Sequence, residues 1–165
     1  MLLKLTYMQQ LSPPSRDSLH PPKPGVHVSR MRLGLKEYLS LYESIGRPYQ
    51  WDERLRLPTQ RLAEILESEC LDHFVLELEH QPIGLCEFDR TALPEIELVN
   101  FGLIPSMHGQ GLGSYFLDHC LREAWKHGPV RIWLHTDTND HPSAIRVYSN
   151  AGFEAYLERV EEFPD

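Results

Sequence analysis

The sequence predicts a mixed α/β fold built on one sheet. Segments rich in aromatic and aliphatic residues, which favour strands, come before and between segments with helical periodicity. The chain shows no internal repeat. Its 165 residues, 41% hydrophobic and 24% charged, suffice to bury a core without metal ions or disulfides. We therefore expect one domain over residues 1–165.

The first part of the chain contains two expected strands and two expected helices. Leu2 to Leu11 alternates polar and apolar residues, which indicates a strand, and we expect it at an edge of the sheet. The proline-rich residues 12–25 indicate an extended connector, because proline lacks an N–H donor and restricts φ. The remaining expected elements here are a strand over 26–31 and helices over 33–45, ended by Gly46, and 58–68.

The second part holds five expected strands and two expected helices. Leu112, Phe116 and Leu121 belong to an apolar stripe that predicts a long helix ending before Gly128-Pro129. Pro142 marks the first turn of a shorter helix. The expected elements are strands over 73–79, 83–89, 95–104, 130–135 and 153–160, and helices over 111–127 and 142–150.

Charge and cysteine content restrict the class of partner and the compartment. The 16 Lys and Arg against 24 Asp and Glu, a net charge of −8, argue against nucleic-acid binding, which needs clustered cations. No apolar run is long enough to span a membrane, and the N-terminus lacks the pattern of a signal peptide. Three widely spaced cysteines without a C-x-x-C pair favour a cytoplasmic protein with incidental thiols.

A glycine-rich loop lies where an expected strand passes into the long helix. Gly109, Gly111 and Gly113 occupy alternate positions, so backbone N–H groups there can approach a ligand closely. The first helical turn adds unpaired donors and a partial positive charge, which suits a phosphate or diphosphate. A P-loop would need a lysine, and a dinucleotide fingerprint would need glycine where Ser114 stands. The alternative is a strand-to-helix turn that binds no ligand.

The loop resembles the signature of the GCN5-related N-acetyltransferase (GNAT) superfamily. That signature reads (Arg or Gln)-x-x-Gly-x-(Gly or Ala), and the match here is His108-Gly-Gln-Gly111-Leu-Gly113, with His in the first place. The wider pattern resembles a bacterial subgroup of uncharacterised acetyltransferases, and the resemblance covers about residues 72–156.

A second superfamily motif follows at the expected place. The superfamily has Asn-x-x-Ala-x-x-x-Tyr-x-x-x-Gly-Phe after its fifth core strand. Here the stretch reads His141-Pro-Ser-Ala144-Ile-Arg-Val-Tyr148-Ser-Asn-Ala-Gly152-Phe153, in which only the leading Asn is replaced. Two ordered motifs at the correct spacing are more specific than either alone.

The resemblance implies a fold and a co-substrate. The fold is a mixed, mostly antiparallel sheet of six or seven strands with four helices, splayed between core strands 4 and 5. Acetyl-CoA enters the split and pairs with the strand edge like an added strand, and the superfamily needs no metal. The cofactor-binding residues that the resemblance implies are Phe101, Gly102, Leu103, Ile104, His108, Gly109, Gln110, Gly111, Leu112, Gly113, Ser114, His141, Ala144 and Tyr148.

Two residues are candidates for proton transfer. Glu97 lies on the expected strand at the offset where histone-type members of the superfamily place a catalytic glutamate. Such a glutamate serves as a general base, because an amine acceptor is protonated near pH 7 and must lose a proton to react. The alternative is that Glu97 and Glu95, on the same face, are only solvated. Tyr148 matches the superfamily tyrosine that protonates the departing thiolate; the alternative is a core tyrosine on an amphipathic helix. Cys120 fits a buried structural thiol, which favours direct transfer without an acyl-enzyme.

The acceptor side has only general candidates. Tyr49, Trp51 and Arg54 lie in a region that often borders the acceptor cleft in the superfamily, but they equally fit ordinary packing. His135 and Asp137 are secondary candidates for acceptor binding or proton relay. Metal binding by these two with Asp140 and His141 is an alternative, although their spacing matches no known metal motif, and Asp140 could instead cap the helix that follows.

These features predict an N-acetyltransferase that moves acetyl from acetyl-CoA to a primary amine of a small molecule or peptide, by direct attack in a ternary complex. One alternative is a non-catalytic acyl-CoA-binding regulatory module, and another is an interaction protein without a CoA site. Dimers are frequent in the superfamily, so a homodimer is one expected state.

Overall fold

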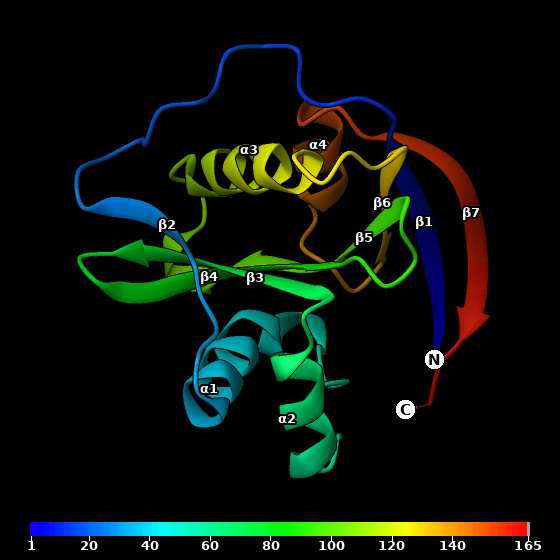
Figure 1. Cartoon of the computed structure of the whole chain (residues 1–165). Coiled ribbons are helices and arrows are strands. Elements are labelled where there is room, and N and C mark those ends of the chain that lie inside the picture. Colours follow the sequence, from blue (N-terminus) through cyan, green and yellow to red (C-terminus); the bar gives the residue numbers. More distant parts are fainter. Residues whose placement is uncertain (165) are drawn as a thin grey trace.

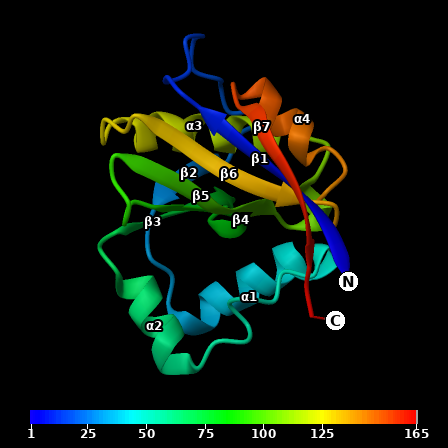
Figure 2. The same ribbon diagram turned by 90° about the vertical axis from the view of Figure 1, so that its right-hand side faces the viewer.

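The computed structural model describes residues 1–164. The strands are β1 Leu2–Gln10, β2 Val26–Arg30, β3 Leu71–Leu78, β4 Gln81–Asp89, β5 Glu95–Leu103, β6 Arg131–Asp137 and β7 Glu154–Glu162. The helices are α1 Leu35–Gly46, α2 Thr59–Glu67, α3 Leu112–Trp125 and α4 Ala144–Asn150, with short 3-10 turns at Arg47–Tyr49 and Pro105–Met107. The strands form one seven-stranded sheet in the order β2-β3-β4-β5-β6-β1-β7. The helices α3 and α4 cover one face, and α1 and α2 cover the other (Figures 1 and 2).

The predicted mixed sheet with four helices is confirmed, and most elements lie within two residues of the expected bounds. One expectation is wrong: β1 is not at an edge but lies between β6 and β7, antiparallel to both. Alternating polar and apolar residues report which face of a strand is buried, and they carry no information about whether both of its edges are paired. The edge position next to β1 belongs instead to β7.

Two hydrophobic cores hold the layers together. On one face, α3 contributes a fully buried stripe that includes Phe116, Leu117 and Cys120. On the other, residues of α1 such as Tyr38 and Ile45 pack with α2 against the opposite face of the sheet. Burial raises the pKa of the Cys120 thiol, as expected for a structural cysteine.

The sheet opens between β5 and β6, as the family resemblance predicts. These two strands run parallel and pair only from Glu95–Arg131 to Glu97–Trp133. Beyond that point the β4–β5 register shifts, so that Phe88 pairs with Leu98 and Glu87 with Asn100, leaving Val99 as an extra residue. Such a bulge bends its strand. The bend accounts for β5 leaving β6 and opening the sheet at its middle.

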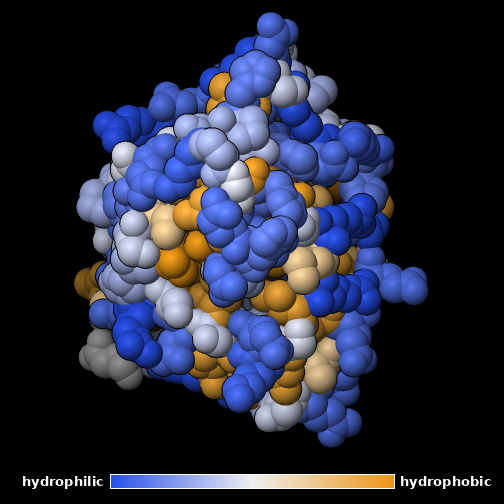
Figure 3. Space-filling model, turned by 90° about the vertical axis from the view of Figure 1, so that its left-hand side faces the viewer, coloured by the Kyte–Doolittle hydropathy of each residue, from blue (hydrophilic) through white to orange (hydrophobic). Residues whose placement is uncertain are grey.

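The connector after β1 runs over α3 before it reaches β2 (Figure 1). Seen from the side where β2 lies, hydrophobic side chains show in several patches around the middle of the surface, with hydrophilic ones between and around them (Figure 3). No helix within residues 1–164 is long and apolar enough to cross a membrane.

Candidate active site

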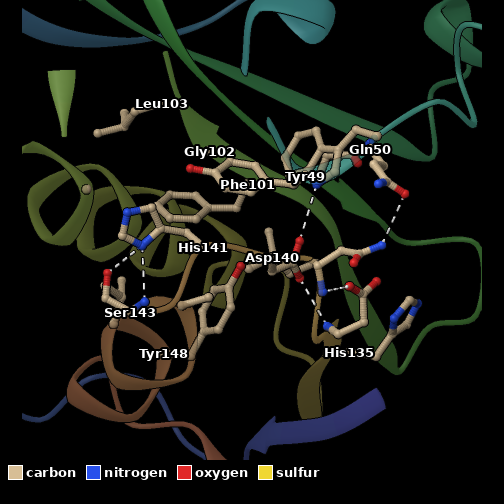
Figure 4. A pocket seen from close by; sticks show the side chains of 18 of the residues that line it. Tyr49, Gln50, Phe101, Gly102, Leu103, His135, Asp140, His141, Ser143 and Tyr148 are labelled. Carbon is tan, nitrogen blue, oxygen red and sulfur yellow. Dashed lines mark hydrogen bonds between the residues drawn. The ribbon is translucent and has the colours of Figure 1, made fainter. Parts of the chain in front are cut away.

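A cleft of about 1290 Å³ opens where β5 and β6 separate. Its walls are the outer part of β5, the loop before α3, the end of β6 with the start of α4, and the loop after α1 (Figure 4). The sequence-predicted residues that line it are Tyr49, Trp51, Phe101, Gly102, Leu103, His108, Gly109, Gly111, Gly113, Ser114, His135, Asp137, His141, Ala144 and Tyr148. Segments far apart in the sequence therefore meet around one space.

The glycine loop forms an exposed row of donors. Gly109 and Gly111 both have a φ of +76°, a conformation that glycine adopts without strain. Within residues 1–164, no hydrogen bond is donated by the backbone N–H groups of residues 109–114. A Cβ on Gly109 would meet nothing within 4 Å, and one on Gly113 would find its nearest atom at 3.8 Å. Packing thus does not require glycine here, whereas close approach of a ligand would.

The two departures from the superfamily motifs touch each other. The rings of His108 and His141 lie edge to face, with their centroids 4.8 Å apart. The Nε2 atom of His108 lies 3.1 Å from the carbonyl oxygen of Leu103, and the Nδ1 atom of His141 accepts a hydrogen bond from the N–H of Ser143 at 3.1 Å. Burial lowers the pKa of His141, and the neighbouring His108 and Arg146 lower it further. Both imidazole rings are therefore held in the wall of the cleft by these contacts.

Three expected cofactor residues keep their side chains out of the cleft. Leu112 is fully buried in the core, and Ile104 packs against both hydrophobic clusters. The Ile104 N–H is also used, since it donates to the carbonyl of Ile83 at 2.9 Å. Gln110 is exposed on the outside of the loop. Neither the Gln110 nor the Leu112 side chain lines the cleft, so these two residues would meet a ligand there through their backbone groups.

Tyr148 reaches into the cleft from α4 (Figure 4). Its ring lies 6.1 Å from that of Phe101 and 6.0 Å from that of Phe153, measured between centroids. Burial raises the pKa of its phenol, and the charge of Asp140 adds to the effect. The hydroxyl has no hydrogen-bond partner within residues 1–164. Tyr148 is therefore a protonated phenol with its donor unused.

Glu97 is half-buried on β5, beside the cleft rather than in its lining. It pairs across the strands with Asp89 on one side and Trp133 on the other. Burial, together with the charges of Asp89 and Glu53, raises the pKa of its carboxyl to about 7. Glu53, whose charge contributes to this shift, itself lines the cleft.

The loop after α1 is joined to the end of β6 across the cleft. The indole Nε1 of Trp51 donates to Asp140 Oδ1 at 3.3 Å. Asp140 also accepts from the hydroxyl of Thr136 and, at 3.1 Å, from the N–H of Asp137. It does not cap α4, whose N-cap is Ser143 without a side-chain bond. The structure thus rules out the capping role for Asp140.

Arg54 takes a structural position away from the cleft. Its side chain is buried, and its guanidinium lies 3.7 Å from Glu87, which is fully buried. Glu87 also accepts from the hydroxyl of Tyr38 at 2.6 Å and from the amide of Asn100 at 3.2 Å. Within residues 1–164, no group of three or more His, Cys, Asp or Glu side chains is arranged to hold a metal ion.

Sequence reasoning missed several residues that line the cleft. Asn100 is one of them, and a polar residue inside an apolar strand was a usable signal for it. Glu53, Arg146 and the β1 residues Leu3 and Leu5 carried no such signal, because their neighbours in space are remote in the chain.

Comparisons with known proteins agree with this geometry. The profile of the Acetyltransferase (GNAT) family matches residues 38–153. The ribosomal protein bS18-alanine N-acetyltransferase of Escherichia coli strain K12 is 31% identical over 75 residues, which are 46% of this chain and 50% of that protein. The chain thus spans about half the length of the curated relatives it matches.

Solved structures share the fold at low sequence identity. A GCN5-related N-acetyltransferase from Sphaerobacter thermophilus has a TM-score of 0.73 and 18% identity, covering 96% of this chain and 50% of that chain. An aminoglycoside acetyltransferase from an uncultured soil metagenomic sample has a TM-score of 0.63 and 13% identity, and the match covers 77% of this chain and 87% of that chain. At such low sequence identities, the structural similarity supports a shared fold and nothing further.

Proposed function

The chain belongs to the Acetyltransferase (GNAT) family, and on that premise we propose that it transfers an acetyl group from acetyl-CoA to a primary amine. The observation that carries the proposal is the row of unused N–H groups over residues 109–114, at the point where the sheet opens. Together with the start of α3, these donors suit the diphosphate of coenzyme A. The free edge of β5 would hold the pantetheine arm.

The chemistry that we propose is direct attack by the amine on the thioester. The amine nitrogen forms a bond to the carbonyl carbon, and a backbone N–H of β5 near the bulge at Val99 stabilises the developing oxyanion. Glu97, acting through a water molecule, takes the proton that the amine loses. The C–S bond then breaks, and Tyr148 gives its proton to the departing sulfur.

The acceptor end of the cleft favours a cationic amine. Four carboxylates, Asp52, Glu53, Asp137 and Asp140, line the cleft with two arginines. The pairing of Arg56 with Asp52 leaves three carboxylates against one arginine, Arg146. Burial, followed by the charge of Asp140, raises the pKa of Asp137, which indicates a crowded negative region. We propose that this region attracts the ammonium group of a small molecule or of a peptide before it loses its proton.

A test of the diphosphate site uses Gly111→Ala, at the glycine that the superfamily motif requires. Its φ of +76° strains any other residue, so the variant should be less stable than the wild type by about 1–2 kcal/mol. An added Cβ would find only Pro22 Cβ, at 3.9 Å, so it would stand in the open space before the loop and should weaken acetyl-CoA binding by about 10- to 100-fold, because charged hydrogen bonds are lost. Titration calorimetry measures the affinity, and thermal unfolding measures the stability.

Gly128→Ala is the matched control. Gly128 lies just beyond the other end of α3 with a φ of +69°, and no atom lies within 4 Å of an added Cβ. This variant should lose a similar amount of stability and should bind acetyl-CoA as the wild type does. Wild-type affinity in Gly111→Ala, or an equal loss of affinity in Gly128→Ala, would contradict the diphosphate site. Tight binding without acetyl transfer to any of a panel of amines would favour the non-catalytic module.

A further inference from the structure

The connector between β1 and β2 is fastened to α3. The N–H of Leu19 donates to Asp118 Oδ2 at 3.1 Å, and the same carboxylate oxygen lies 3.1 Å from Nε of Arg122. Arg122 in turn donates to the carbonyl of Arg16 at 2.7 Å. Asp118 is buried, and the Leu19 side chain packs against the core. The connector therefore has a defined path rather than a free one.

This path brings a lysine to the glycine loop. The Nζ atom of Lys23 donates to Oε1 of Gln110 at 2.7 Å. Pro22 lies nearby as well, with its Cβ 3.9 Å from the place that a Cβ on Gly111 would occupy. Prolines on both sides of Lys23 restrict the backbone, so little freedom is lost when the lysine binds. An ammonium has three donors, and Gln110 uses one of them.

The loop itself provides no cation for a diphosphate. The first position of its motif, where arginine or glutamine is usual in the superfamily, is His108. The His108 ring faces inward, in contact with the Leu103 carbonyl and the His141 ring. The backbone donors of residues 109–114 are neutral. Lys23 is thus the cation in hydrogen-bond contact with the loop, and it comes from a segment outside both motifs.

We propose that Lys23 binds the diphosphate of acetyl-CoA from the connector, opposite the backbone donors of the loop. The inference rests on the proposed function, because it assumes that the diphosphate lies at residues 109–114. The Lys23 ammonium would leave Gln110 or share it with a phosphate oxygen, and the connector would form the outer wall of the diphosphate site.

The test compares Lys23→Gln, Lys23→Arg and Lys126→Gln with the wild type. Lys126 lies at the far end of α3, where it pairs with Glu123 at 2.7 Å, and its replacement makes the same change in net charge. Acetyl-CoA and 3′-dephospho-CoA, which keeps the diphosphate and lacks the 3′-phosphate, are titrated by calorimetry at low and high salt. Thermal unfolding without ligand confirms that each variant is folded.

We expect Lys23→Gln to bind both ligands about tenfold more weakly at low salt, and less so at high salt, because a partly exposed charged hydrogen bond is lost. Lys23→Arg should recover most of the affinity, and Lys126→Gln should match the wild type. Unchanged affinity in Lys23→Gln, an equal loss in Lys126→Gln, or a loss confined to acetyl-CoA would each overturn the inference. Wild-type protein that binds neither ligand would instead refute the proposed function.

Discussion

Replacement of Tyr148 by phenylalanine is expected to lower kcat by about 100- to 10,000-fold, the range typical of a lost general acid. The thiolate of coenzyme A would then leave without a proton donor at hand. Affinity for acetyl-CoA should hardly change, because the ring contacts with Phe101 and Phe153 do not involve the hydroxyl. Release of free thiol, followed under single-turnover conditions, separates the chemical step from product release.

Tyr115→Phe is the control for this prediction. Tyr115 is also buried, and burial raises its pKa, but it lies on α3 outside the cleft lining. Its loss should leave thiol release unchanged. If Tyr148→Phe turned over like the wild type, Tyr148 would be a packing residue and the proton for the leaving group would come from elsewhere.

Replacement of Glu97 by glutamine should remove the base and with it a characteristic pH dependence. Because the pKa of Glu97 is raised to about 7, kcat/KM of the wild type should rise as the carboxyl loses its proton around that pH. In Glu97→Gln we expect a drop of about 100- to 10,000-fold above this pH and no step near 7. Initial rates measured from pH 5.5 to about 8.5 at saturating acetyl-CoA give the profile.

Glu95→Gln is the matched control, because Glu95 lies two residues away on the same face and is held by Arg131 at 2.7 Å. That variant should keep the step near pH 7. A step that persists in Glu97→Gln would assign the base to another group.

The raised pKa of the Glu97 carboxyl also makes the stability of the fold depend on pH. In the unfolded chain Glu97 titrates near its ordinary pKa of 4.5, whereas in the folded protein it keeps its proton to about pH 7. The folded state therefore binds more protons between these values, and stability from this group falls as pH rises through the window. Glu97→Gln should lack this loss, so its urea midpoint, relative to the wild type, should rise between pH 5 and about pH 8. Activity and stability thus change in opposite directions.

Local features of the chain could be predicted from the sequence alone. The three alternating glycines, the apolar stripe of α3 and the Ala–Tyr–Gly–Phe motif are short-range patterns, and the backbone conformation that they favour depends on neighbours within a few residues. The glycine loop and the expected helices and strands were accordingly placed well. The position of β1 was not, because pairing on both of its edges depends on strands more than a hundred residues away.

From the sequence alone, the glycine loop between β5 and α3 and the place of Tyr148 in the motif after β6 could be predicted. The contacts of His108 with His141, of Trp51 with Asp140, of Arg54 with Glu87 and of Lys23 with the loop are found only in the tertiary structure. The raised pKa of Glu97 belongs to the same group, since it arises from burial and from the charges of Asp89 and Glu53. Electrostatic and packing effects act over a few ångströms in space, and sequence spacing does not report which distant segments come that close.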